Sequence, residues 1–333
     1  MNRLIVDVHR HIVVPEVTRE AGGDEPWQPS VRWEDGAQVI ELGGQVIRSA
    51  VREFVHLDRI LEEARSSEID HVVLSPWVNL LGYALEPHEG LHVARLQNEP
   101  LSAASEAHAG RISAFGAVPL HVPELAAREL EALMRLPGIR GVEIAASVRG
   151  EYLGADRFLP FWEAAEAMGA VVFVHPTTKG FDLPVFGEYY LWNTVANPME
   201  TAVTAAHLVM AGVLERFPGL RVVLAHGGGA LMAVRGRVRH AHTFQAQARA
   251  RLRGSPDESL ARLCYDTVTH DRELLRSLIM YAGSDHVLLG SDDPFDMGTA
   301  HPVEEVRALE LQPHEREAVL GGNAVRLLDL KEG

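Results

Sequence analysis

Residues 212–229, which read GVLERFPGLRVVLAHGGG, contain the unit from which the fold is inferred. A helical pattern ends near Gly219, an apolar strand is predicted over Arg221–Ala225, and His226 follows the strand directly. A strand that is apolar at every position after its first residue needs cover on both faces, which is typical of parallel sheets flanked by helices. The stretch therefore predicts one β–α unit of an α/β protein.

The same alternation of strand and helix runs along the whole chain. The predicted strands are Leu4–His9, His71–Ser75, Ile112–Val118, Ile139–Ile144, Val171–Val174, Arg221–Ala225, Leu263–Asp266 and His286–Gly290. The predicted helices are Leu57–Arg65, His88–His108, Pro123–Leu136, Phe158–Ala167, Pro198–Arg216, Leu231–Ala250, Arg272–Tyr281 and Val303–Leu328. Eight such units favour an α/β fold of the (β/α)8 TIM-barrel type, with a doubly wound open sheet as the alternative.

One stretch after the first predicted strand departs from this alternation. Residues 31–49 contain short strand-like runs separated by Asp35-Gly36 and Gly43-Gly44, which are hairpin-turn signals. We therefore expect a small β-meander inserted at 31–49 over the barrel mouth, within a single barrel domain that spans residues 1–333.

The composition limits the possible classes of protein. Of 333 residues, 47% are hydrophobic and 23% are charged, which indicates a globular chain. The net charge of −15 disfavours binding to a nucleic-acid backbone. The single cysteine, Cys264, excludes an internal disulfide and predicts a reducing compartment, so we expect a cytoplasmic protein. The N-terminal apolar run is too short for a signal peptide or a membrane span.

Candidate metal ligands stand at the ends of three predicted strands. His9 and His11 follow one another with the i, i+2 spacing that places them on one strand face, His175 ends the fifth strand, and Asp292 follows the eighth. Any one of these residues has an ordinary explanation as a core histidine or a turn cap. Strand ends meet at the mouth of a barrel, and three imidazoles with one carboxylate suit Zn²⁺, with Mn²⁺ as second choice.

Residues near these ligands are candidates for proton transfer and for orienting a ligand. His226 ends the sixth strand, and it is either another metal ligand or a general acid/base beside the metal; we favour the second role. Asp292 is itself a candidate for relaying a proton. Asp266 and His270 follow the seventh strand, where they could orient a metal ligand.

The motifs at these positions resemble those of the ACMSD-like family, named for 2-amino-3-carboxymuconate 6-semialdehyde decarboxylase, in the amidohydrolase superfamily. They are DVHRH at 7–11, FVHP at 173–176, NPMETA at 197–202, AHGGGA at 225–230 and LLGSDDPF at 288–295. The resemblance covers almost the whole chain. It implies a (β/α)8 barrel, one metal ion held by His9, His11, His175 and Asp292, and His226 as the catalytic acid/base.

The distribution of lysine favours one metal ion over two. Binuclear amidohydrolases bridge their metals with a carbamylated lysine on the fourth strand, and Ile139–Ile144 contains none. The only two lysines of the chain are Lys179, past the fifth strand, and Lys331, at the terminus. We therefore expect a mononuclear site.

The same resemblance suggests substrate-binding residues and a dimer. Arg52 is similar to the family's substrate-carboxylate arginine, with Arg48 as a rival. Arg237 is similar to an arginine that reaches the neighbouring subunit's site, which predicts a homodimer that shares its active sites. Where the decarboxylase has a pocket tryptophan, this chain has Asn193, or Trp192 if the register shifts by one.

The predicted activity is a metal-dependent, oxygen-independent decarboxylation of an unsaturated or aromatic carboxylic acid. The same site could instead hydrolyse a lactone or amide, or hydrate a conjugated double bond. Neither a dinucleotide-binding nor a P-loop glycine motif occurs, so no organic cofactor is expected. An HGGG-type serine esterase would need a G-x-S-x-G elbow, which the chain lacks. A non-catalytic metal-binding protein is the remaining alternative.

Overall fold

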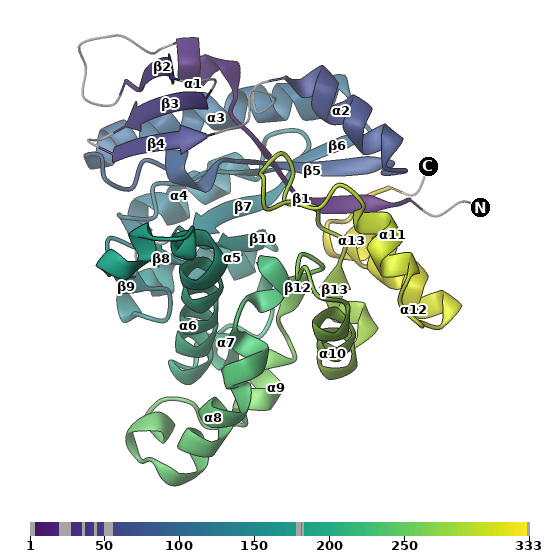
Figure 1. The fold of residues 1–333 in the computed structure, drawn as a ribbon. Helices are drawn as coiled ribbons and strands as arrows, with labels where there is room; N and C mark the ends of the chain where they lie inside the picture. The colour runs from purple at the N-terminus through teal and green to yellow at the C-terminus, as the bar shows by residue number, and fades with distance from the viewer. Residues whose placement is uncertain are drawn as a thin grey trace.

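The computed structural model describes residues 4–19, 28–34, 37–42, 45–49, 56–177, 181 and 183–331. Its centre is a parallel sheet of eight strands, with helices packed around the outside (Figure 1). The strands, in sheet order, are β1 (Val6–Ile12), β5 (His71–Pro76), β6 (Ile112–Gly116), β7 (Ile139–Ala145), β10 (Val171–His175), β11 (Arg221–Leu224), β12 (Cys264–Asp266) and β13 (Val287–Leu288).

The two ends of this sheet meet, so the strands form a barrel. Val8 N donates to Leu289 O at 2.9 Å, and Asp292 N donates to His9 O at 2.8 Å. His11 N donates to Asp293 O, also at 2.8 Å. The predicted (β/α)8 barrel is therefore confirmed, and the open doubly wound sheet is excluded, because such a sheet leaves its edge strands apart.

Each strand buries both of its faces, as its apolar sequence predicts. In β10, Val171 and Phe173 belong to the cluster inside the barrel, whereas Val172 and Val174 pack against the surrounding helices. Because successive side chains alternate, His175 at the end of β10 follows Val171 and Phe173 onto the inner face.

A bulge in β1 changes this alternation. Val6 and Val8 belong to the inner cluster, yet His9 and His11 also face the interior. The register with β5 shifts between Asp7 and Arg10, so that the extra residue is accommodated there. Without the bulge, His9 and His11 would point outward, toward the helices.

Helices cover the outer face and one end of the barrel. The longer ones are α2 (Leu57–Ser66), α3 (Pro87–Ala107), α4 (Pro123–Leu133), α5 (Leu159–Met168), α6 (Asn197–Met210), α8 (Leu231–Phe244) and α10 (Arg272–Ala282). Shorter helices are α1 (Pro15–Arg19), α7 (Val213–Arg216), α9 (Pro256–Leu260), α11 (Pro302–Arg307), α12 (Pro313–Glu317) and α13 (Asn323–Leu327). No helix among the described residues is both long and apolar enough to cross a bilayer.

Three predicted helices are wrong in extent. The pattern over Val303–Leu328 breaks into α11, α12, a π-helical turn and α13, since Pro313 starts a new helix within it. The pattern over Pro198–Arg216 divides at Gly212, whose φ of 74° lies in the left-handed region. The pattern over Leu231–Ala250 ends as α8 at Phe244.

The predicted β-meander is confirmed. Strands β2 (Ser30–Glu34), β3 (Ala37–Leu42) and β4 (Gln45–Ser49) form an antiparallel sheet after β1. The predicted turns Asp35-Gly36 and Gly43-Gly44 lie outside the described residues. Ile40 and Leu42 are buried in the main hydrophobic cluster, so the meander packs against the rest of the fold. A second small hairpin, β8 (Ser147–Val148) with β9 (Glu151–Tyr152), was not predicted.

Candidate metal centre

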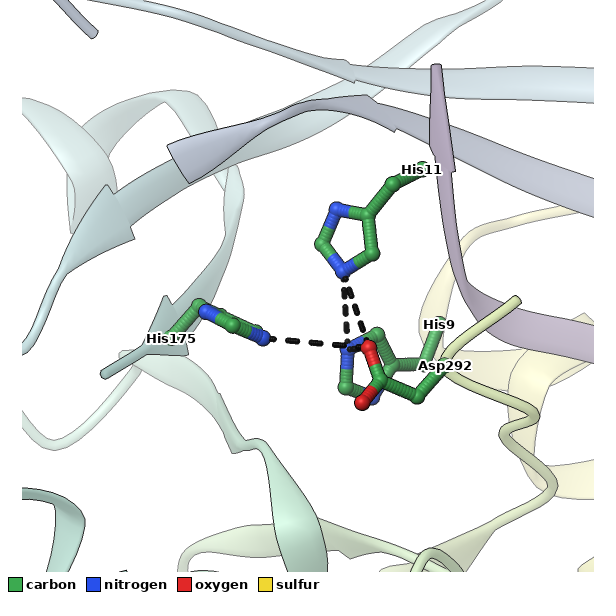
Figure 2. A group of neighbouring side chains, drawn as sticks. All are labelled: His9, His11, His175 and Asp292. Carbon is green, nitrogen blue, oxygen red and sulfur yellow. Dashed lines mark hydrogen bonds and ion pairs between the residues drawn. The ribbon is translucent and has the colours of Figure 1, made fainter. Parts of the chain in front are cut away.

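Four side chains converge at the C-terminal ends of the barrel strands (Figure 2). His9 and His11 come from β1, His175 is the last residue of β10, and Asp292 follows β13. One donor atom from each lies within 4.8 Å of the donor atoms of the other three, and none of the four residues is more than 5% exposed. The structure therefore brings together the four residues that the sequence predicted as metal ligands.

The donor atoms are arranged around one point. Asp292 Oδ1 lies 3.1 Å from His9 Nε2, 3.3 Å from His11 Nε2 and 4.0 Å from His175 Nε2. His175 Nε2 and Asp292 Oδ1 are buried, and neither makes a hydrogen bond with a described residue. Buried polar atoms are ordinarily paired, so these two atoms fit ligands of a metal ion.

The charges at the site also suit a cation. Burial would raise the pKa of Asp292, but the imidazoles of His9, His11 and His226 hold it well below its usual range. Burial and the neighbouring imidazoles lower the pKa of His175 well below its ordinary value, and burial also lowers that of His11. An ionised carboxylate and neutral imidazoles are the protonation states that bind metals.

The pKa of His9 is raised, in contrast to those of His11 and His175. Burial disfavours its charged form, but the carboxylates of Asp292 and Asp266 outweigh burial and raise its pKa to about 10. The two carboxylates therefore favour positive charge beside His9. A divalent cation between His9 and Asp292 would supply that charge and replace the imidazole proton.

Groups behind the histidines turn their Nε2 atoms toward this point. His9 Nδ1 lies 2.6 Å from Asp266 Oδ2, and His175 Nδ1 lies 2.9 Å from the carbonyl oxygen of Pro176. His11 Nδ1 is 3.3 Å from Ser75 Oγ. Such contacts fix the tautomer and the ring orientation of a metal ligand. Of the two residues expected to orient a ligand, Asp266 contacts one, whereas His270 instead contacts the carbonyl of Met297 at 2.8 Å.

His226 stands beside the four-residue group. Its Nε2 is 3.2 Å from Asp292 Oδ2, and its Nδ1 is buried without a hydrogen-bond partner among the described residues. The backbone at His226 is left-handed, with a φ of 56°. The following turn needs glycine, because a Cβ on Gly229 would lie 2.2 Å from the carbonyl oxygen of Pro198.

A buried acid near the site was not singled out from the sequence. Glu143 lies on β7 with 0% exposure, and its Oε2 is 3.6 Å from His11 Nδ1. Burial raises the pKa of Glu143 to about 8. The available signal was a single carboxylate in the second half of the strand Ile139–Ala145, where its neighbours Val142 and Ile144 are apolar.

None of the predicted substrate residues that the structure describes belongs to the group of four converging donors. Arg237 is exposed on α8 and makes no hydrogen bond or ion pair within the described part of the chain. Trp192 is 41% exposed, with its ring 4.9 Å from that of Tyr190, and Asn193 is half-buried beside it. Arg52 lies outside the described residues, and for Arg48 only the backbone in β4 is described.

A barrel with three histidines and a carboxylate at its strand ends defines a class of metal-dependent barrel enzymes. The chain belongs to the amidohydrolase family, whose profile matches residues 84–330. It is 30% identical, over 274 residues, to 2-amino-3-carboxymuconate-6-semialdehyde decarboxylase of Dictyostelium discoideum, covering 81% of this chain and 76% of that protein.

Solved structures share the whole fold. The apo form of the Metarhizium anisopliae IDCase matches with a TM-score of 0.86 and 26% identity, covering 99% of this chain and 98% of that one. A dihydroxybenzoic acid decarboxylase from Polaromonas sp. JS666, solved with manganese and the inhibitor 2-nitroresorcinol, matches with a TM-score of 0.81. Its identity is 20%, over 100% of this chain and 98% of that one. These findings confirm the family and the barrel that the sequence predicted.

Proposed function

We propose that the protein is a metal-dependent, oxygen-independent decarboxylase that acts on an unsaturated or aromatic carboxylic acid. The observation that carries this proposal is the convergence of His9, His11, His175 and Asp292, with His226 Nδ1 buried and unpaired beside them. The relatives named above as decarboxylases support the reaction class.

The four converging residues would hold one divalent ion, and their N3O donor set leaves a position open for a substrate oxygen. Zn²⁺ suits such a set, and Mn²⁺ is supported by its presence in the Polaromonas enzyme. When bound, the ion would polarise a substrate oxygen and so stabilise negative charge that develops there.

His226 would supply the proton for the reaction. With Nε2 donating to Asp292 Oδ2, the proton on Nδ1 faces away from the ligand group and can pass to the substrate carbon that bears the carboxylate. The bond from that carbon to the carboxylate then breaks, its electron pair returns to the unsaturated system, and CO₂ leaves. The carboxylate of Asp292 stabilises the charged imidazole before the transfer, and a proton taken up from water restores the charged imidazole afterwards.

A panel of candidate substrates tests this proposal. We expect the Zn²⁺- or Mn²⁺-loaded protein to release CO₂ from at least one carboxymuconate semialdehyde or hydroxybenzoate, equally well with and without oxygen. The measurement is anaerobic CO₂ release together with product mass, and His175→Ala serves as the inactive control. A product heavier by one water, or cleavage of a lactone or amide without CO₂, would identify the protein as a hydratase or hydrolase instead.

We also propose a cytoplasmic homodimer in which Arg237 binds the substrate carboxylate in the partner's site. Arg237 is exposed on α8, the helix that follows His226, and it has no charged partner among the described residues. A guanidinium binds carboxylate through two parallel hydrogen bonds, and Arg52 and Trp192 or Asn193 would complete the pocket. These assignments rest on the family resemblance and on the exposure of Arg237.

Complementation between two inactive variants tests the shared site. When Arg237→Ala and His175→Ala chains are mixed, each hybrid dimer has one site with both defects and one with neither. Random pairing should therefore restore about a quarter of wild-type activity. Turnover is measured after subunit exchange has been verified by mass. An active monomer, or no recovery in verified hybrids, would contradict the shared site.

A further inference from the structure

One buried carboxylate connects the candidate metal ligands to His226. Asp266 is the last residue of β12 and has 0% exposure. It is outside the group of four converging donors, and it contacts both His9 on β1 and the backbone of His226, which follows β11. Its neighbours show what it can do there.

Both oxygens of Asp266 accept hydrogen bonds. Oδ2 lies 2.6 Å from His9 Nδ1 and accepts from the backbone N–H of His226 at 3.0 Å. Oδ1 accepts from the backbone N–H of Gly227 at 2.8 Å and from that of Val268 at 3.1 Å. Three backbone donors and one imidazole therefore surround a single carboxylate.

The contact with His9 determines which nitrogen faces the metal position. Because a carboxylate only accepts hydrogen bonds, it requires the proton of His9 on Nδ1. The lone pair of His9 Nε2 is then free to bind a metal ion beside Asp292, whose Oδ1 lies 3.1 Å from this nitrogen.

The contacts with His226 and Gly227 stabilise a strained turn that follows β11. His226 and Gly227 have φ angles of 56° and 60°, in the left-handed region that disfavours a residue with a side chain. Their consecutive N–H groups both point at Asp266, which stabilises this conformation. The turn is what brings His226 Nε2 within 3.2 Å of Asp292 Oδ2.

We propose that Asp266 is a positioning residue with two effects. It fixes the tautomer of His9 for metal binding, and it holds the backbone of His226 in place for proton transfer. The role for His226 rests on the proposed decarboxylation, whereas the role for His9 concerns metal binding alone. One substitution at Asp266 should therefore damage two measurable properties.

Asp266→Asn is the test, because it keeps the size of the side chain. All four neighbours donate, so the amide NH₂ must face donors on one side whichever way it is turned. The affinity for Mn²⁺ alone, measured by competition with a chromophoric chelator, is expected to fall about 10–100-fold. At saturating Mn²⁺, kcat should remain at least about 10-fold below wild type with KM little changed, because His226 is displaced.

The outcomes separate this proposal from simpler roles. A lower Tm with unchanged Mn²⁺ affinity would show a merely structural role and overturn the proposal. Lower affinity with full recovery of kcat at saturation would overturn the part that concerns His226. A crystal structure of the variant in which the 226–229 turn is unchanged would also overturn the part that concerns His226. This readout does not depend on activity, so it remains available if the wild-type protein decarboxylates no tested acid.

Two further variants complete the design. Asp271→Ala removes a carboxylate that caps α10 by accepting from Leu274 N at 2.8 Å, and it should lower Tm while leaving the Mn²⁺ affinity unchanged. Asp266→Ser is the alternative if the asparagine variant does not fold, because the smaller side chain leaves space for a water molecule. We expect the same losses of Mn²⁺ affinity and of kcat at saturating Mn²⁺. Wild-type Mn²⁺ affinity in Asp266→Ser would overturn the proposal.

Discussion

His226→Ala is expected to keep one metal ion per chain and to lose turnover by roughly 10²–10⁴-fold, as the removal of a general acid/base does. The imidazole lies 3.2 Å from Asp292 Oδ2 and packs against the rings of His9 and His175, but it supplies none of the four converging donor atoms, so these donors remain after the substitution. Turnover and metal content are measured on the same preparation.

His240→Ala is the matched control for this variant, because His240 is an exposed histidine on α8, fourteen residues further along the chain. It should retain both the metal and the activity. If His226→Ala instead loses its metal, His226 is a ligand and the assigned role is wrong.

Replacement of His9, His175 or Asp292 by alanine is expected to abolish stoichiometric metal binding and, with it, activity. The wild-type protein should hold about one divalent ion per chain, and each substitution removes one of four donors. The measurement is metal content by elemental analysis after gel filtration, with the folded state checked by circular dichroism.

His121→Ala is the control here, since His121 is also buried, at 4% exposed, but lies outside the group of converging donors. It should keep its metal. Two ions per wild-type chain, or full occupancy after loss of a proposed ligand, would contradict the mononuclear site.

Much of the barrel could be predicted from local patterns. The predicted strand Val171–Val174 matches β10 to within one residue, because a short apolar run between a helix end and His175-Pro176 has few alternatives. The end of the chain was less predictable. Residues 303–328 have a continuous helical pattern, but Ala324 on α13 and Leu328 directly after it belong to the inner cluster of the barrel, which requires the chain to turn.

The residue types of the candidate site were visible in the sequence, since strand ends meet at the mouth of a parallel barrel. Of the groups that support them, Asp266 was already a candidate for orienting a metal ligand, whereas Glu143 was not singled out. Glu143 and Asp266 are 123 residues apart in the sequence. Glu143 lies beside His11 and Asp266 beside His9, and only the closed barrel brings both carboxylates to the first strand. The sequence also could not show that His226 lies beside the four converging donors and is not one of them, because that depends on the tertiary structure.

The sequence by itself determined the strand–helix alternation, the inserted meander and the histidines and carboxylate at the strand ends, because these depend on local periodicity and on the order of elements. The tertiary structure decided which way the candidate ligands point. The bulge between Asp7 and Arg10 turns His9 and His11 inward, and the four hydrogen bonds to Asp266 fix His9 and the His226 turn. Both depend on contacts between distant strands, whose register a pattern along one chain does not contain.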